Sequence, residues 1–402
     1  MNSGSIKRLP LEGLRVIDLS HMMAGPFCTQ MMADQGAEVI KIEPPGRGDL
    51  SRKSGNVYVG GESTIFLSLN RNKKSLTLDL KHPTGKEIIL KLVKTADVFI
   101  ENMRPGAIGK IGLGFDYLHK VNPRLVYCSI SGFGQRGLYA HKTGMDGVAQ
   151  AMAGIMSLTG EEGGPPCKPG VNIPDPMSGL VALQGILMAL FARERTGIGQ
   201  KVEISLFYSA MLSLLPREGE FFVTGKQPPR MGTAMPNMEP CRAFQTKDDK
   251  AIFIHVFNED FWQKLAKKLG HEEWIIDPRF KTNTERVKNR KELVPLVEKE
   301  FATRTQVEMM KLLDEDGIPN GPVFDFHELF SDPQVIQDQM VIELSHPTAG
   351  SYKTIGNPLC FSNAHPPLRN PPPLLGQHTE EILKNLGYSA MDIKTLKSEK
   401  II

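Results

Sequence analysis

The chain has 402 residues, of which 40% are hydrophobic and 23% are charged. This length is enough for two domains with cores of their own. The formal net charge is only +3 and no long basic run occurs, so the composition gives no support to nucleic-acid binding. The five cysteines are widely spaced and form no CxxC pair, so neither a zinc site nor a disulfide framework is predicted.

Signals for export or membrane insertion are weak. The longest apolar stretch, residues 179–192, is shorter than a bilayer-spanning helix and contains Gln184. Residues 1–8 include two basic residues and no hydrophobic signal core. We therefore expect a cytoplasmic protein without a membrane partner, and the unpaired cysteines fit a reducing compartment.

The first third of the chain alternates predicted strands and helices. Strands are expected at residues 14–20, 37–43, 75–80, 97–101 and 124–131, and helices at 26–33 and 83–94. This alternation predicts an α/β fold with a Rossmann-like large domain, in which a mostly parallel sheet carries helices on both faces.

The rest of the chain is expected to add a smaller α+β domain. Residues 145–214 read as helical with a strand at 202–206, and the proline-rich residues 215–240 read as a linker. A hairpin over 243–256 and helices at 261–269 and after the capping box Thr305–Glu308 follow. We thus expect a large domain over 1–214, a small domain over 225–330, and a return to the large domain over 331–402, with a loopy tail from 324 to 375.

The turn at residues 18–26, between the first strand and the first helix, is similar to a nucleotide-binding turn. Gly25 is its only glycine, so the cradle for a dinucleotide pyrophosphate is missing, and no P-loop motif occurs elsewhere. Taken singly, the basic residues at strand ends read as solvated surface charges. Together they could hold the phosphates of a nucleotide-like cofactor: Lys73, Lys74, Arg104, Lys110 and Lys142.

Two acidic residues precede predicted helices. Asp175 stands between Pro174 and Pro176, which restrict the backbone on both sides of its carboxylate. It reads either as a helix N-cap followed by proline at the first helical position, or as a reacting group. The helix N-terminus would help to keep it ionised and therefore nucleophilic. Asp146 also reads as an N-cap, or as a second carboxylate that shares the chemistry with Asp175.

Segments spread along the chain match one known family. They are residues 11–18, 24–26, 36–43, 48–49, 70–75, 97–102, 104–106, 132–135, 196–200 and 375–379. On these segments the chain resembles the class III coenzyme A-transferases, the family of formyl-CoA transferase and carnitine CoA-transferase, from residue 9 to residue 400.

The resemblance implies a mechanism, a site and an assembly. Asp175 would be the nucleophile that forms first an acyl-aspartyl anhydride and then an aspartyl-CoA thioester, while backbone N–H groups stabilise the oxyanions. The partners would be an acyl-CoA, a small carboxylic acid and a second copy of the chain in an interlocked homodimer. No metal and no permanently bound cofactor would be needed. The family's CoA-binding positions correspond to Met23, Ala24, Asn70, Lys73, Asn102, Arg104, Lys110, Lys142 and Met145.

Departures from the family pattern narrow the substrate. Formyl-CoA transferase carries glutamine at the position of Met23 and arginine at that of Pro44, and residues 230–238 replace its glycine-rich loop. These differences argue against formate or oxalate and favour a donor similar to succinyl-CoA. An α-methylacyl-CoA racemase would carry histidine at Met145, whose thioether accepts no proton. A catalytically silent CoA-binding protein is the third possibility, and the Pro-Asp-Pro frame of Asp175 argues against it.

Overall fold

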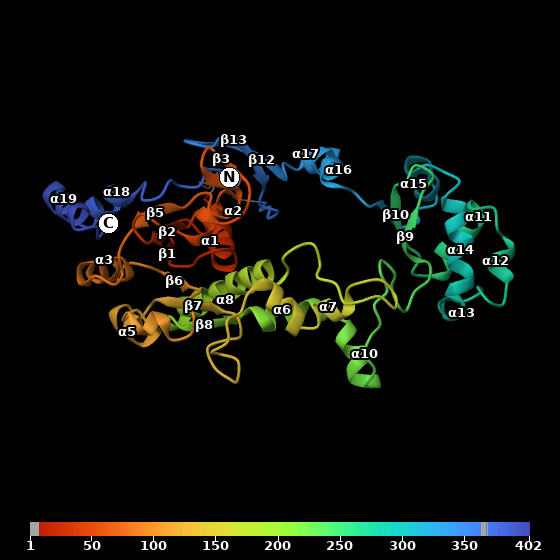
Figure 1. Ribbon diagram of the computed structural model, residues 1–402, viewed down its shortest axis with the longest axis horizontal. Helices are drawn as coiled ribbons and strands as arrows, with labels where there is room; N and C mark the ends of the chain where they lie inside the picture. Colours follow the sequence, from red (N-terminus) through yellow and green to blue (C-terminus); the bar gives the residue numbers. More distant parts are fainter. Residues whose placement is uncertain (1–7, 363–366, 368) are drawn as a thin grey trace, which may run out of the picture. The chain divides into compact units, whose positions relative to one another are not determined.

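The computed structural model describes residues 8–362, 367 and 369–402. Most of the segment that was searched for a signal sequence, residues 1–7, therefore lies outside the described residues. The chain divides into two compact units, which are described separately (Figure 1). The large unit contains the residues up to 155 together with 170–215 and 336–402, and the small unit contains 156–169 and 216–335.

A six-stranded parallel sheet forms the centre of the large unit, in the order β5-β2-β1-β6-β7-β8. Its strands are β1 (Arg15–Asp18), β2 (Glu38–Glu43), β5 (Lys74–Thr77), β6 (Val98–Glu101), β7 (Val126–Ser131) and β8 (Lys201–Ser205). The order reverses between β1 and β6, as in Rossmann-like folds. The predicted α/β class and the mostly parallel sheet are therefore confirmed, and the strand positions agree within a few residues.

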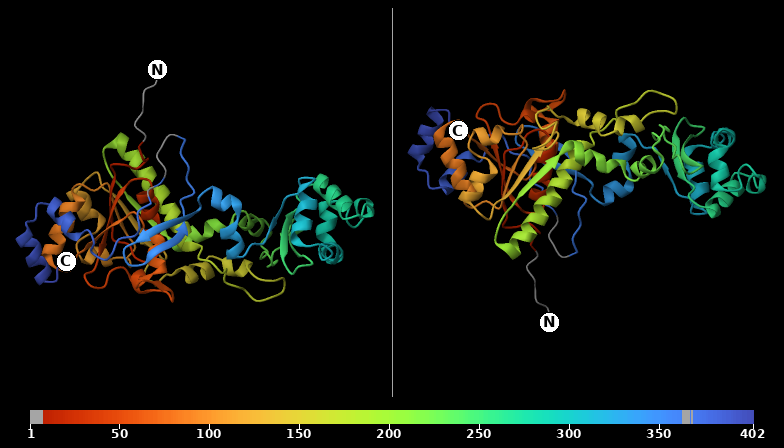
Figure 2. Two further views of the ribbon diagram at one scale, coloured as in Figure 1. Left: turned by 90° about the horizontal axis from the view of Figure 1, so that it is seen from above. Right: turned by 90° about the horizontal axis from the view of Figure 1, so that it is seen from below.

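Apolar residues on both faces of the sheet explain why helices cover both faces. Along β1, Val16 faces one hydrophobic cluster and Ile17 the other, because successive side chains of a strand point to opposite faces. One cluster includes α3 (Pro83–Val93), α5 (Phe115–Val121), α18 (Thr379–Asn385) and α19 (Ala390–Ser398). The other includes α1 (Ala24–Asp34), α6 (Asp146–Met152) and α8 (Pro174–Thr196). Figures 1 and 2 show α1 and α8 beside the sheet.

Shorter elements complete the large unit. They are η1 (Leu50–Lys53), the hairpin β3 (Tyr58–Val59) and β4 (Glu62–Ser63), α2 (Thr64–Leu69), α4 (Ala107–Lys110), α9 (Leu206–Met211), η2 (Leu212–Leu214) and the hairpin β12 (Val341–His346) and β13 (Gly350–Ile355). The β12–β13 hairpin is held in the large unit by Arg71. The Arg71 side chain pairs with the buried Asp34 and donates a hydrogen bond to the Ile355 carbonyl at 2.8 Å. Helix α7 (Ile155–Leu158) begins at the boundary of the unit.

The small unit is an α+β fold. Its antiparallel sheet has the order β11-β10-β9, with β9 (Cys241–Gln245), β10 (Ala251–His255) and β11 (Asn320–Pro322). Its helices are α10 (Arg217–Thr224), α11 (Glu259–Lys268), α12 (Glu273–Ile276), α13 (Asn283–Lys288), α14 (Arg290–Phe301), α15 (Gln306–Asp314) and α16 (Phe326–Ser331), with α17 (Pro333–Gln337) at the boundary. The capping box predicted at Thr305 and Glu308 is present at the start of α15.

The structure corrects two stretches that were expected to be irregular. The proline-rich residues 215–240 include α10, whose helix ends at Gly225 in the left-handed conformation that glycine adopts readily. The tail from 324 to 375 includes α16, α17 and the β12–β13 hairpin. Prolines flank these elements rather than interrupt them. A high proline content therefore did not predict correctly that these stretches would be irregular.

Helix α8 is the longest helix described and packs against α1, β7, β8 and α9. By length and composition it could cross a membrane, with 23 residues and a mean hydropathy of 1.4 in its most apolar window. A helix that packs on a sheet passes the same test, so this is weak evidence for a span. The helix extends beyond the apolar stretch 179–192 at both ends, so it is longer than the sequence pattern predicted.

Candidate active site

Several of the sequence-predicted residues follow the carboxyl ends of parallel strands, where open α/β sheets bind their ligands. At the point where the strand order reverses, His21 follows β1 and Asn102 follows β6. The Asn102 amide bridges the two strand ends: its Oδ1 accepts from the His21 N–H and its Nδ2 donates to the His21 carbonyl, each at 2.8 Å. This side chain, predicted to contact CoA, therefore fixes the turn that leads into α1.

Asp175 is the second residue of α8 and does not cap it. The N-cap is Ile173, and Pro174 occupies the first helical position. The N-cap assignment from sequence was wrong because Pro174 already has the backbone angle of the first helical turn. The Asp175 carboxylate is only partly buried, and no described residue donates a hydrogen bond to it. It is free to react with a ligand.

Asp146 places a second carboxylate at the start of α8, although it belongs to a different helix. It is the first residue of α6 rather than its N-cap, which is Met145. Its Oδ2 accepts the backbone N–H of Asp175 at 3.2 Å, so Asp146 caps α8 instead of its own helix. The two acidic residues that were singled out from the sequence are thus direct neighbours in the fold.

Burial and the neighbouring Asp146 raise the pKa of Asp175 from its ordinary value to about 6. The helix start was expected to favour ionisation of Asp175, and the raised pKa runs in the opposite direction. Pro174 and Pro176 have no N–H, and the N–H of Asp175 donates to Asp146. At pH 7 a carboxyl group with this pKa is still about nine-tenths ionised.

Close packing brings the turn between β1 and α1 to the same place. A Cβ on Gly179 would lie 2.8 Å from the Ala24 carbonyl oxygen, so only glycine lets the second turn of α8 approach the start of α1 so closely. The Nδ2 of Asn172 also lies 3.5 Å from the Met23 sulfur. Met23 and Ala24, two predicted CoA-binding residues, are therefore positioned beside the segment that carries Asp175.

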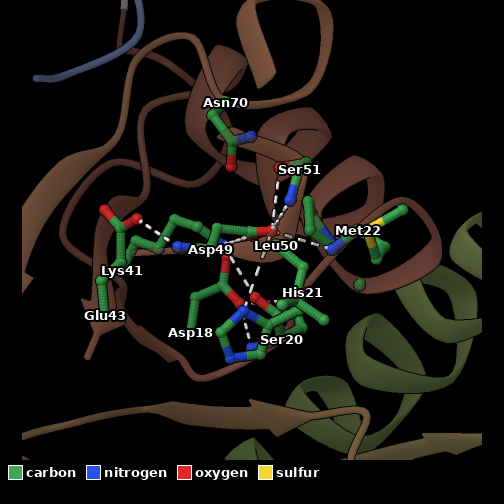
Figure 3. A network of polar contacts seen from close by, with 12 residues as sticks. Asp18, Ser20, His21, Met22, Lys41, Glu43, Asp49, Leu50, Ser51 and Asn70 are labelled. Carbon is green, nitrogen blue, oxygen red and sulfur yellow. Dashed lines mark hydrogen bonds and ion pairs between the residues drawn. The ribbon is translucent and has the colours of Figure 1, made fainter. Parts of the chain in front are cut away.

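A network of buried charges supports this turn (Figure 3). The Lys41 ammonium lies 2.6 Å from Asp49 Oδ2, and both side chains are fully buried. Asp49 Oδ1 in turn accepts the N–H of Met22 at 3.1 Å. Met22 has φ of 67°, a left-handed conformation that is uncommon for a residue other than glycine. Although burial opposes its ionisation, the neighbouring Lys41 ammonium keeps the pKa of Asp49 well below its usual range.

The same network continues through Glu43, at the end of β2. Its carboxylate accepts two hydrogen bonds from Arg52, at 2.7 and 2.8 Å, and one from the Asp49 N–H at 2.8 Å. Asp18, at the end of β1, pairs with Lys73 at 3.2 Å. The six buried charged groups of the network are balanced, three acidic and three basic, which makes their burial tolerable: Asp18, Glu43, Asp49, Lys41, Arg52 and Lys73.

Lys73 and Asn70 lie in the interior rather than on an open phosphate-binding surface. The Lys73 ammonium donates to Asp18 Oδ2, to the Pro26 carbonyl at 2.9 Å and to Asn70 Oδ1 at 2.9 Å, which uses all three of its N–H bonds. Burial lowers the pKa of Lys73 to about 8. Both residues hold the end of α2 against the start of α1.

The remaining predicted CoA-binding residues are exposed. Arg104 and Lys110 follow β6, and Lys142 follows β7 with its ammonium 4.4 Å from the centre of the Tyr139 ring. The Met145 side chain is 58% exposed. These cations are accessible to an anionic ligand, unlike Lys73, and they lie in the segments that follow two neighbouring strands, with Lys110 at the end of α4.

Sequence reasoning missed several residues that shape the site. Gln150 is fully buried and donates to Asp146 Oδ1 at 2.6 Å; its spacing of four residues from Asp146, on one helical face, was the available signal. Lys41 is a charged residue between the apolar residues Ile40 and Ile42 of β2, which also signals a buried pair. In the described part of the chain, no group of three or more metal-binding side chains is found.

Comparisons with known proteins agree along nearly the whole chain. A family model described as CoA-transferase family III matches residues 11–379. The succinyl-CoA:glutarate CoA-transferase of Mus musculus is 41% identical, over 98% of this chain and 90% of the relative. The succinyl-CoA–D-citramalate CoA-transferase of Chloroflexus aurantiacus is 36% identical, over 98% of both. The crystal structure of a CAIB/BAIF family protein from Brucella suis matches with a TM-score of 0.85 and 36% identity, over 94% of this chain and all of that one.

Proposed function

Because the chain belongs to CoA-transferase family III and is a CoA-transferase, as the resemblance predicted, we propose that Asp175 carries the transfer covalently. The observation that supports this most is the state of its carboxylate. It is partly buried, receives no hydrogen bond from any described residue and lies against Asp146. Each of these features raises the reactivity of a carboxylate and leaves its oxygens free for a substrate.

The proposed reaction exchanges bonds of similar energy and needs no proton. A carboxylate oxygen of Asp175 attacks the donor thioester, the C–S bond breaks, and CoA leaves as its thiolate with an acyl-aspartyl anhydride behind it. The thiolate then attacks the aspartyl carbonyl carbon, which releases the donor acid and leaves an aspartyl-CoA thioester. The acceptor carboxylate repeats these two steps in reverse and leaves as its CoA thioester.

We propose a donor similar to succinyl-CoA and a small carboxylic acid as acceptor. The departures at Met23 and Pro44 argue against formate and oxalate, and the two relatives described above are both named for succinyl-CoA. Arg104, Lys110 and Lys142 are exposed cations in the segments that follow β6 and β7. They can pair with the CoA phosphates or with a second carboxylate of the acid.

The protein is further proposed to act as a homodimer. Eight large apolar side chains stay exposed on α8, α9 and the residues that follow: Leu180, Leu187, Met188, Phe191, Tyr208, Met211, Leu212 and Leu215. So much apolar surface on adjacent elements is typical of a surface that is covered by another chain. Light scattering at micromolar concentration is expected to give twice the mass of the chain, and a monomer would contradict this assembly.

Trapping of the intermediate tests the proposed chemistry directly. We expect hydroxylamine, added after incubation with succinyl-CoA, to convert Asp175 to its hydroxamate, which peptide mass spectrometry detects. Asp146 lies beside it and serves as an internal control that is not modified. If turnover proceeds while no adduct forms at Asp175, covalent transfer through this residue is wrong. Exchange of an α-proton of the acyl group with solvent deuterium, without transfer, would favour a racemase.

A further inference from the structure

We propose that Gln150 is a positioning residue that, together with Asp146, clamps both ends of the segment 171–175 and so holds Asp175 in place for attack. The inference rests on the proposed role of Asp175 as the nucleophile. Gln150 itself touches no reacting atom in this arrangement, so it would act only through its neighbours.

The geometry of the clamp consists of three hydrogen bonds. At one end of the segment, the Gln150 Nε2 donates to the Val171 carbonyl at 3.2 Å. At the other end, Asp146 Oδ2 accepts the N–H of Asp175 at 3.2 Å. The two halves are joined because Gln150 Nε2 also donates to Asp146 Oδ1 at 2.6 Å. One buried amide therefore connects the segment's first carbonyl to its last N–H through a single carboxylate.

Only a side chain with two N–H donors at this position can make the clamp. Both groups that face Nε2, the Val171 carbonyl and Asp146 Oδ1, are acceptors. The other atom of the amide, Oε1, is buried and has no hydrogen-bond partner among the described residues. Gln150 thus makes both donor bonds of the clamp while its own oxygen stays without a hydrogen bond, which costs stability. This favours a role in placing the segment over a role in stability alone.

The segment requires such a clamp because its own backbone provides little support. Pro174 and Pro176 supply no N–H to the first turn of α8. Ile173 packs against a small hydrophobic cluster and Pro174 is buried, but Val171 and Asn172 are exposed, so core packing does not hold the start of the segment. Apart from the clamp, the contact of Asn172 with the Met23 sulfur at 3.5 Å is a weak attachment. A displaced nucleophile loses rate even where the substrate still binds, because attack depends on distance and angle.

Two substitutions test the clamp. Gln150→Leu removes both donors, and Gln150→Glu keeps the shape but presents acceptors to acceptors. For each we expect the rate of aspartyl adduct formation in a single turnover, and kcat, to fall roughly fivefold or more, while KM for the acyl-CoA changes less than twofold. Gln306→Leu is the matched control. Gln306 is also buried and donates to a backbone carbonyl, that of Ala251 at 2.8 Å, but it belongs to the small unit.

The outcomes separate this inference from the proposed function. If the wild-type protein forms no adduct at Asp175, the proposed function fails. If it does so and the Gln150 variants form the adduct at an unchanged rate, only the clamp is wrong. If Gln150→Leu and Gln306→Leu lose the same thermal stability and the same fraction of kcat, Gln150 has only a structural role. Should Gln150→Leu not fold, the same readouts on Gln150→Glu decide the question.

Discussion

Replacement of Asp175 by asparagine is expected to lower turnover by at least about a thousandfold, because an amide cannot form the anhydride or the thioester. The hydroxylamine-trapped adduct should disappear with it. Affinity for CoA should change little, since the exposed cations Arg104, Lys110 and Lys142 are untouched. Steady-state kinetics and a binding isotherm for CoA measure the two expectations separately.

The same substitution is expected to stabilise the fold at pH 7. Burial, and then Asp146, raise the pKa of Asp175 to about 6 from the ordinary aspartate value of 3.8, so the folded state disfavours its ionised form. The stability associated with this group is fully present below pH 3.8 and is lost as the pH rises through 6. Asparagine carries no charge and so removes the free-energy cost of holding an ionised carboxylate at this position. For a pKa shift of this size the cost is at most about 3 kcal/mol. An inactive variant that is less stable than the wild type at pH 7 would contradict this account of the site.

The parallel sheet and its helices could be predicted from the sequence because their cause is local. The strands of the sheet are short segments that carry buried apolar side chains, and helical spacing of apolar residues between the strands predicts the crossovers. The strand order itself follows from the pairing of β1 with both β2 and β6, which no local pattern contains. The capping box at Thr305 was predictable for the same reason, since both of its members lie within four residues.

The interior of the site could not be predicted because its bonds join residues far apart in the chain. Lys73 was expected to meet a phosphate, yet its ammonium is fully buried against Asp18, which lies 55 residues earlier. Asp49 lies in a segment that matches the family, but no local pattern showed that it supports both Lys41 and the strained Met22. The β12–β13 hairpin was likewise missed, because its anchor Arg71 lies some 280 residues away.

The acidic residues before α6 and α8 show how a correct local signal can lead to a wrong role. Asp146 does accept a helix N–H, as an N-cap would, but the N–H belongs to Asp175 of another helix. Residue type and proximity to a helix start predicted a cap, while the identity of the capped helix depended on the fold. The resulting pair of neighbouring carboxylates, and with it the raised pKa of Asp175, was therefore visible only in the structure.

The acid limb of the pH–rate profile is expected to follow Asp175 and to move when Asp146 is neutralised. The ionised form is the nucleophile, so kcat/KM should be constant above pH 7 and fall as the pH drops through 6. At pH 5 only about a tenth of the free enzyme should carry the reactive carboxylate. Asp146→Asn removes the like charge and leaves only burial to raise the pKa, so the limb should shift to lower pH.

Normalising each profile to its own plateau makes this shift independent of any loss of rate. That step is necessary because Asp146→Asn also disturbs the bond to Gln150, since its new Nδ2 would face the Gln150 Nε2 or force that amide to turn over. The matched control is Asp260→Asn, an exposed carboxylate of α11 that pairs with Lys264 in the small unit. Its normalised profile should coincide with that of the wild type. If Asp146→Asn leaves the acid limb in place, Asp146 does not tune the nucleophile and burial alone sets its pKa.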